Sequence, residues 1–202
     1  MKSLVIIGAG GHGKVVADIA KLNGYENVKF LDDNVSGSVL NLSIVGKVED
    51  AIKFKNDNDL FVAVGNNEVR CQLIKTLVEK GATLPILIHP SAVIGSGFKM
   101  GCGSLVCANV VINAEAVLGN GVIVNTCSSV DHDCIIGDYS HVSVGAHLAG
   151  NVKIGSCTLI GAGATVINNV EVCKDTVIGA GAVVVKDIID SGVYVGVPAL
   201  RR

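Results

Sequence analysis

A six-residue repeat dominates the chain; it begins in the stretch IGSGFKMGCGSLVCANVVINAEAVL, residues 94–118, and continues to residue 188. A large aliphatic residue stands at every sixth position, sixteen times in succession. These hexad residues are Ile94, Met100, Val106, Ile112, Leu118, Val124, Val130, Ile136, Val142, Leu148, Ile154, Ile160, Val166, Val172, Ile178 and Val184. Because the chain is 50% apolar, chance would give sixteen successive hits in about one of sixty thousand registers.

A period of six residues fits neither a helix nor the two-residue alternation of an ordinary strand. It fits a short strand followed by a turn, with one inward residue on each face and glycine where the backbone turns. Three such faces close a triangular coil of about 18 residues, so the repeat predicts slightly more than five coils of a parallel β-helix. The alternative is a run of buried strands in an ordinary α/β domain, but these residues show no helical segments.

Composition agrees with a narrow β-helix and disfavours several classes of protein. Aromatic residues make up only 3%, and the net charge of −2 gives no basic surface for nucleic acid or an anionic membrane. No apolar run reaches the roughly 18 residues that span a bilayer, and the glycine-rich residues 1–13 do not fit a secretory signal. The seven cysteines contain no C-x-x-C pair. We therefore expect a cytoplasmic protein without disulfides or a metal.

The residues before the repeat predict a small α/β domain with a phosphate site. A buried strand at residues 3–8 leads into Gly8-Ala9-Gly10-Gly11-His12-Gly13, which matches G-x-G-x-x-G. An amphipathic helix and a second strand follow, and this strand ends at Asp32-Asp33. The order predicts an anionic ligand at the start of the helix, where free N–H groups and the helix dipole favour negative charge.

The same domain is predicted to contain a short helix, two further strands and a second long helix. The short helix is expected at residues 48–56, and the strands at residues 60–65 and 84–88. The long helix is expected at residues 68–81, with Asn66 or Asn67 as its cap. Residues 34–41 read as a loop. One βαβ half of this size predicts a mononucleotide site rather than a dinucleotide site.

Two segments mark the ends of the predicted β-helix. His89-Pro90 ends the first domain, because the residue before a proline avoids helical conformation. At the other end, GVYVGVPALRR (residues 192–202) breaks the repeat. We expect Pro198 and the two arginines to cover the open end of the last coil, which otherwise exposes strand edges.

This order of segments resembles that of the bacterial hexapeptide-repeat sugar acetyltransferases, which act on UDP-4-amino-sugars in the bacillosamine pathway or on sialic acid. The motifs that carry the resemblance are GGHGK, FLDD, VGNNEVR, the D-H-D segment at residues 131–133, and VGVPA. The resemblance implies a nucleotide-sugar-binding half-Rossmann α/β domain at residues 1–88. It implies a left-handed parallel β-helix acetyltransferase domain at residues 89–202, and a homotrimer with active sites between subunits.

Acyl transfer from acetyl-CoA needs a base for the nucleophile's proton and a donor for the thioester oxyanion. His132 is the candidate base, because a neighbouring carboxylate would fix the tautomer of its imidazole and raise its basicity. The resemblance implies that Asp133 is this partner, although the bacillosamine enzyme has a glutamate there. The alternative is an exposed histidine in a turn.

An 18-residue coil places residue 150 directly above His132, about 4.8 Å away. Residue 150 is a glycine, which leaves space beside the imidazole and exposes a backbone N–H. The resemblance implies that this N–H of Gly150 faces the acetyl group of acetyl-CoA. Asn168 and Lys186 continue the column, and Lys186 is either an ordinary surface lysine or a contact to a coenzyme phosphate.

The resemblance also supplies the other candidate residues. It implies that Asn125 lies near the acceptor amine as part of the catalytic group, and that acetyl-CoA contacts His141, Ala162 and Ala180. It implies that the UDP-sugar is held by Gly10, Gly11, His12, Asp32 and Asp33. His147 has no assigned role.

We therefore expect an acetyl-CoA-dependent N-acetyltransferase that acts on the 4-amino group of a UDP-amino-sugar, without metal, nucleic acid or membrane partners. One alternative is a sialic acid or other sugar O-acetyltransferase. Another is a nucleotide-sugar-binding or scaffolding protein with an inactive β-helix, which the pair His132-Asp133 and Gly150 disfavour. A nicotinamide-dependent oxidoreductase is disfavoured by the short first domain.

Overall fold

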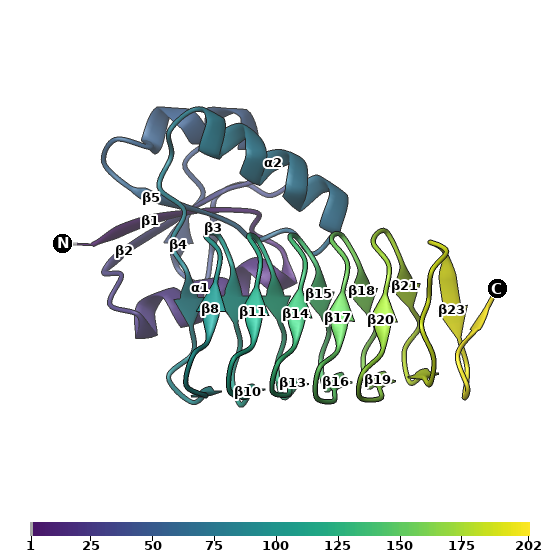
Figure 1. Cartoon of the computed structure of the whole chain (residues 1–202). Coiled ribbons are helices and arrows are strands. Elements are labelled where there is room, and N and C mark those ends of the chain that lie inside the picture. Colours follow the sequence, from purple (N-terminus) through teal and green to yellow (C-terminus); the bar gives the residue numbers. More distant parts are fainter. Residues whose placement is uncertain (1) are drawn as a thin grey trace. The chain divides into compact units, whose positions relative to one another are not determined.

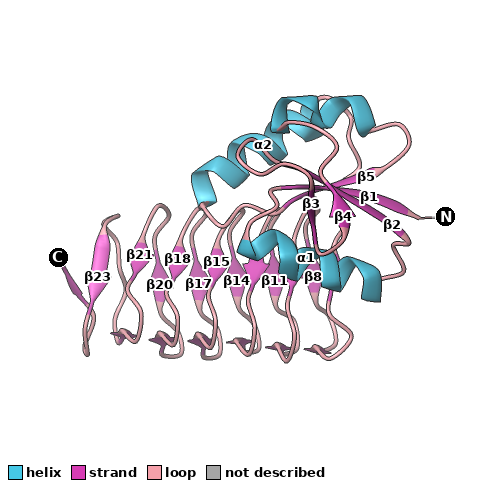
Figure 2. Cartoon of the chain, turned by 180° about the vertical axis from the view of Figure 1, so that it is seen from behind, coloured by secondary structure: helices cyan, strands magenta, loops and turns pink. Residues whose placement is uncertain are grey.

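The computed structural model describes residues 2–202, and the chain divides into two compact units. The first unit ends at Ile88 and the second begins at His89. All helices of the described residues lie in the first unit, and the second is a stack of similar coils (Figures 1 and 2). No helix within residues 2–202 is both long and apolar enough to span a membrane.

The first unit is built on a three-stranded parallel sheet in the order β2-β1-β5. Its strands are β1 (Ser3–Ile7), β2 (Asn27–Leu31) and β5 (Asp59–Val62). The central strand is a continuous apolar run, because α1 contacts it on one side and η1 on the other. From Leu4 to Ile7 its side chains are completely buried. The predicted strand–loop–helix–strand order is confirmed.

The helices of this unit are α1 (Gly11–Leu22), η1 (Val48–Phe54, a 3₁₀-helix) and α2 (Asn67–Glu79). Of the two candidate caps, Asn66 is the one that caps α2, since its side chain accepts the N–H of Val69 at 3.0 Å.

Two features of the first unit differ from the sequence prediction. The expected loop after Asp33 contains a short hairpin of β3 (Ser38–Val39) and β4 (Leu42–Ser43), with Leu40 and Asn41 at positive φ. Such a turn joins two strands in only two residues. The expected fourth strand at residues 84–88 is wrong in length and place, because only β6 (Leu87–Ile88) is extended and it is not part of this three-stranded sheet.

The second unit is a parallel β-helix in which strand residues pair with residues 18 positions along the chain. The last parallel pairing, Val177 with Val193, is offset by 16 residues. The first face consists of β7 (Val93–Ile94), β10 (Val111–Ile112), β13 (Ser129–Val130), β16 (His147–Leu148), β19 (Thr165–Val166) and β22 (Val183–Val184). The second consists of β8 (Lys99–Met100), β11 (Val117–Leu118), β14 (Ile135–Ile136), β17 (Lys153–Ile154) and β20 (Glu171–Val172). The third contains β9 (Leu105–Val106), β12 (Ile123–Val124), β15 (His141–Val142), β18 (Leu159–Ile160), β21 (Val177–Ile178), β23 (Val193–Val195) and β24 (Leu200–Arg201).

The hexad residues are the second residues of these two-residue strands, and they fill the interior. From Val106 to Val184 each hexad residue is at most 2% exposed. Three residues after a hexad residue, each corner from Gly97 to Gly181 has a residue at positive φ. This left-handed conformation explains why glycine, asparagine and aspartate recur at the corners. The predicted triangular coil is therefore confirmed.

The C-terminal segment ends the stack with a change of strand direction. β23 pairs in parallel with β21, whereas β24 turns back and pairs with β23 antiparallel. The last residues thus cover the edge of β23, as expected for a segment that closes the open end.

Candidate active site

His132 and Asp133 lie in the corner that joins β13 to β14. The Nδ1 atom of His132 lies 2.7 Å from Oδ2 of Asp133. This hydrogen bond raises the pKa of His132 above its ordinary value; partial desolvation opposes the rise and the charge of Asp131 adds to it. With Nδ1–H donated to the carboxylate, the exposed Nε2 is left to accept a proton.

Gly150 lies over the imidazole of His132, one coil further along. A Cβ atom at this position would stand 2.6 Å from both Cε1 and Nε2 of His132. Gly150 is buried, and its N–H has no hydrogen-bond acceptor within residues 2–202. The residue that lies over the imidazole therefore carries an unpaired donor, which suits a reaction that develops negative charge on oxygen.

A second group of the predicted residues lies in a different corner, the one that joins the third face to the first. Asn125 follows β12, and its Nδ2 lies 3.1 Å from Nε2 of His141 on β15. Ala162 and Ala180 occupy the same corner on successive coils, and both are exposed. The first face of the helix separates this group from His132, so one chain does not bring the two groups together.

Three polar residues near these corners show no contact that points to a ligand. Nδ1 of His147 lies 2.9 Å from Oγ of Ser129, so the side chain is engaged one coil below its own position. Asn168 and Lys186 continue the column above Gly150 and are exposed. The structure adds no contact that assigns Lys186 to a ligand.

In the first unit, the glycine motif separates into tight and open positions. Gly8 has φ +107°, and a Cβ on Gly13 would run into the carbonyl of Gly8. Gly10 and Gly11, by contrast, have no atom within 4 Å of the place where a side chain would begin. Gly8 and Gly13 let α1 start close to β1, whereas Gly10 and Gly11 leave the N-terminus of α1 open to a ligand.

Asp32 holds this glycine loop in place. Its carboxylate accepts the backbone N–H groups of Ala9 at 2.7 Å, Asn34 at 2.8 Å and Val35 at 2.9 Å. Burial pushes the pKa of Asp32 upward, but these three bonds outweigh it and hold the pKa below the usual range. Both oxygens are thus already engaged with the backbone.

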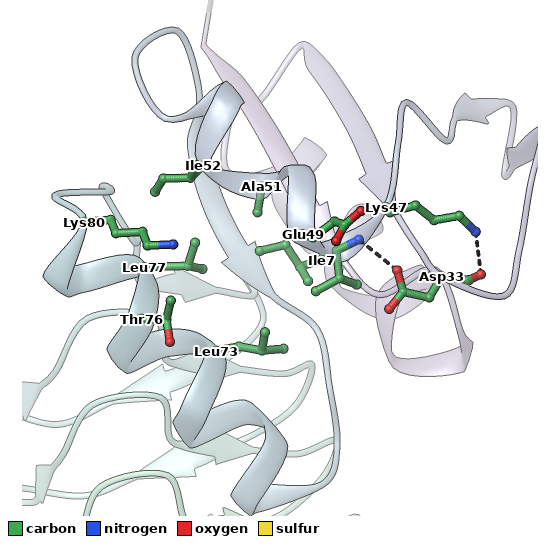
Figure 3. A pocket seen from close by; sticks show the side chains of 11 residues that line it. Ile7, Asp33, Lys47, Glu49, Ala51, Ile52, Leu73, Thr76, Leu77 and Lys80 are labelled. Carbon is green, nitrogen blue, oxygen red and sulfur yellow. Dashed lines mark hydrogen bonds between the residues drawn. The ribbon is translucent and has the colours of Figure 1, made fainter.

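Asp33 instead lines a cavity of about 660 Å³ between η1 and α2 (Figure 3). One oxygen of Asp33 accepts the N–H of Val48 at 3.0 Å, and its main-chain carbonyl accepts Nζ of Lys47 at 2.5 Å. Figure 3 shows Asp33 and Lys47 at one end of the cavity. The apolar part of the lining is Ile7, Val48, Ala51, Ile52, Leu73 and Leu77. Such a cavity suits a flat ring with a few polar atoms.

His12 is neutral at physiological pH because of its surroundings. Burial, together with the charge of Arg70, lowers its pKa to about 4, and its Nε2 is buried without a hydrogen-bond partner in the described structure. Arg70 is only 1% exposed and donates to the carbonyls of Val64 and Gly65. The sequence reasoning assigned no role to Arg70.

The signal for Arg70 was present in the sequence. Arg70, Ile74 and Leu77 are spaced as one face of a helix, and all three are buried in α2. A charged residue at such a position is almost always paired. Within residues 2–202, no group of three or more His, Cys, Asp or Glu side chains could hold a metal ion.

Comparisons with known proteins place this chain beside enzymes of sugar acetylation. The family described as the PglD N-terminal domain matches residues 3–77. The acetyltransferase domain of PglB from Neisseria gonorrhoeae is 42% identical, with 100% of both chains covered and a TM-score of 0.97, and was also solved with acetyl coenzyme A. PerB from Caulobacter crescentus, in complex with CoA and GDP-perosamine, is 38% identical, covers 100% and 98% of the two chains and has a TM-score of 0.95.

Curated relatives match over a shorter region. The UDP-N-acetylbacillosamine N-acetyltransferase of Bacillus subtilis is 33% identical over 115 residues, which are 54% of this chain. The match spans 52% of the length of that protein, and 22% of the length of a mimivirus protein that is 37% identical over 109 residues.

Proposed function

The chain belongs to the family of hexapeptide-repeat sugar N-acetyltransferases, and from this premise we propose that it transfers an acetyl group from acetyl-CoA to an amino group of a nucleotide-linked sugar. The observation that carries the proposal is the pair of His132 and Asp133 beneath the free N–H of Gly150. This corner offers a base, an orienting carboxylate and an oxyanion donor.

In the proposed reaction the sugar amine attacks the thioester carbonyl of acetyl-CoA. Nε2 of His132 takes the proton from the attacking nitrogen, while Asp133 holds Nδ1–H and stabilises the imidazolium that forms. The N–H of Gly150 faces the carbonyl oxygen as its negative charge develops. A carbon–nitrogen bond forms, the carbon–sulfur bond breaks, and the departing thiolate of CoA receives the proton from His132.

We further propose that a complete site uses corners of two copies of the chain. Asn125 and His141 lie across the first face from His132, so a neighbouring copy would have to bring them to the base. Asn125 would then orient the acceptor amine, and His141, Ala162 and Ala180 would line the path of the coenzyme. A cyclic trimer provides three equivalent sites of this kind.

The first unit is proposed to hold the nucleotide of the acceptor sugar. Gly10 and Gly11 admit the pyrophosphate to the start of α1, where backbone N–H groups attract anions. The cavity beside Asp33 has room for the base and ribose, and the oxygen of Asp33 that is not bonded to Val48 can accept the N3–H of uracil. Asp32 acts on the ligand indirectly, by holding the glycine loop.

We propose UDP as the nucleotide, supported by the likeness to the UDP-N-acetylbacillosamine enzyme. PerB was solved with GDP-perosamine instead. A carboxylate suits guanine as well, because guanine also presents ring and amino N–H donors on one edge. Asp33 alone therefore does not separate the two nucleotides, and the acceptor must be determined directly.

The test is mass spectrometry of products formed with acetyl-CoA and a panel of acceptors, namely UDP-linked 4-amino sugars, GDP-perosamine and sialic acid. We expect one acetyl group on a UDP-linked 4-amino sugar, stable to mild alkali as an amide is. Acetylation of GDP-perosamine alone would show that the nucleotide is GDP and not UDP. An alkali-labile product on sialic acid would favour the O-acetyltransferase, and binding without any product would favour an inactive scaffold.

A further inference from the structure

The residue before the proposed base carries a second carboxylate, and its environment is unusual. Oδ1 of Asp131 accepts the backbone N–H of His132 at 2.8 Å. The same oxygen accepts Nδ2 of Asn113, 18 residues earlier and one coil below, at 2.6 Å. The hydrogen bond from Asn113 is the main reason why the pKa of Asp131 is lowered. A side chain of one coil is thus connected to the main chain of the base on the next.

The rest of the His132 main chain is held by backbone alone. The carbonyl of His132 accepts the N–H of Asn151 from the coil above at 2.8 Å. The N–H of Asp133 donates to the carbonyl of Ala114 in the coil below at 3.0 Å. The N–H of His132 has no backbone acceptor, so the side chain of Asp131 is what fixes the peptide unit on this side.

We infer that Asn113 and Asp131 are positioning residues for His132, and that this link aims Nε2 at the space under Gly150. The inference rests on the proposed function, in which His132 is the base. The imidazole is 60% exposed and has one side-chain hydrogen bond, to Asp133. Its direction therefore depends on this hydrogen bond and on the main chain that Asp131 holds.

The charges around His132 are few. Asp131 and Asp133 belong to the same corner. From the coil below, Glu115 turns toward Gly97 and away from the imidazole, since a Cβ on Gly97 would collide with its carboxylate. The coil above contributes Gly150 and Asn151, which are uncharged. Asp131 is thus the second negative group that favours imidazolium.

The chain contains a matched arrangement without a base. In another corner, Nδ2 of Asn120 lies 3.3 Å from Oδ1 of Asp138, again 18 residues later. No histidine adjoins this pair in the sequence. Asn120→Ala removes this side-chain link and the acceptor of the Cys102 N–H, while the backbone N–H of Asn120 still donates to Asp138 at 2.7 Å. It serves as the control for a structural loss away from His132.

The experiment compares acetyl transfer by Asn113→Ala, Asp131→Ala, Asp131→Asn and Asn120→Ala in the full chain. We expect Asn113→Ala and Asp131→Ala to lower kcat about tenfold while KM for acetyl-CoA stays within about twofold, because a misplaced base slows only the chemical step. A double variant with both Asn113→Ala and Asp131→Ala should be no slower than Asp131→Ala alone, since both residues act through one link. Asn120→Ala should keep kcat within about twofold of the wild type.

Asp131→Asn separates the positioning of His132 from the effect of the negative charge of Asp131. The amide oxygen still accepts the N–H of His132, so most of kcat should return. The acidic limb of the kcat/KM profile should move to lower pH, because removal of a nearby negative charge lowers the pKa of His132. If Asn113→Ala and Asp131→Ala behave like Asn120→Ala, the inference is overturned. If His132→Ala is also fully active, the proposed function itself has failed.

A second measurement needs no acceptor sugar. Imidazole ¹⁵N shifts report which ring nitrogen of His132 carries the proton. We expect the Nδ1–H tautomer in the wild type and in Asn120→Ala, and a mixture of both tautomers in Asn113→Ala and Asp131→Ala. An unchanged tautomer in these two variants would contradict the positioning role.

Discussion

Each corner of the repeat has a position two residues after a hexad residue, and Gly150 is the only glycine at these positions. Ala114 stands at the same position two coils below, so the backbone there accepts a methyl group. Glycine at 150 is therefore explained by its neighbour, because a Cβ would lie 2.6 Å from the imidazole of His132.

Gly150→Ala should accordingly damage activity rather than folding. We expect kcat to fall on the order of 10–100-fold, because the methyl group displaces the base and fills the proposed oxyanion site. The melting temperature should stay close to that of the wild type. The measurement is steady-state acetylation combined with thermal unfolding, and a fully active variant would show that the space under Gly150 is not used.

His12 should make the protein sensitive to mild acid. Its pKa is about 4 in the folded chain, against 6.5 for a free histidine. Because protonation favours the unfolded state, its contribution is present above pH 6.5 and is lost as the pH falls toward 4. The loss at pH 5 should be about 2 kcal/mol.

This prediction is checked by urea unfolding at pH 7.5 and pH 5 at a fixed protein concentration. His12→Gln serves as the comparison, since glutamine is polar but does not titrate. We expect the wild type to lose more stability than His12→Gln between the two pH values. Equal losses in both proteins would contradict the account of His12.

At the residue level, sequence reasoning identified chemistry better than it identified geometry. The D-H-D segment and the 18-residue coil were sufficient to place Gly150 over His132. The backbone bonds of Asp32 were not predictable, because they depend on how the loop after β2 folds back on the glycine loop. The buried Arg70 could have been found from helical spacing, but its carbonyl partners could not.

At the level of elements, the repeat determined the second unit because one rule applies to every coil. Each face contributes one inward aliphatic residue, and each corner needs one residue at positive φ, a demand that Asp133 meets with φ 60°. The hairpin of β3 and β4 was missed, since two-residue strands carry no periodicity. The hand of the helix came from the resemblance and not from the spacing.

The α/β unit should bind UDP and not NAD. A single βαβ half with one cavity beside Asp33 accommodates one nucleotide. At a concentration of 100 times Kd, UDP should stabilise the protein by about 2.7 kcal/mol, which a thermal shift detects. Asp33→Ala should abolish this shift.

Asp57→Ala is the control, because Asp57 is exposed and precedes β5, at the opposite edge of the sheet from Asp33. This variant should keep the UDP shift. GDP is included to separate the two nucleotide assignments. A shift with NAD and none with either nucleoside diphosphate would overturn the mononucleotide site.

For the whole molecule, the separation of His132 and Asn125 in different corners predicts that activity requires an assembly of several copies of the chain. We expect light scattering to show three chains, and His132→Ala and Asn125→Ala to be nearly inactive when each is pure. In trimers refolded from an equal mixture, about a quarter of the sites would combine an intact His132 with an intact Asn125 from the neighbour. Activity should then return. A monomer, or mixed trimers without activity, would contradict the shared site.

The central claim is that His132 is the base of an acetyl transfer. Single-turnover acetylation by His132→Ala should be slower on the order of 10²–10⁴-fold, whereas its affinity for acetyl-CoA should hardly change. Asp133→Asn should lose less, because the imidazole remains and only its charged partner is gone. The result that supports the account is a folded His132→Ala assembly that binds acetyl-CoA and hardly transfers its acetyl group. A folded assembly that transfers it within about threefold of the wild-type rate would remove His132 from the mechanism.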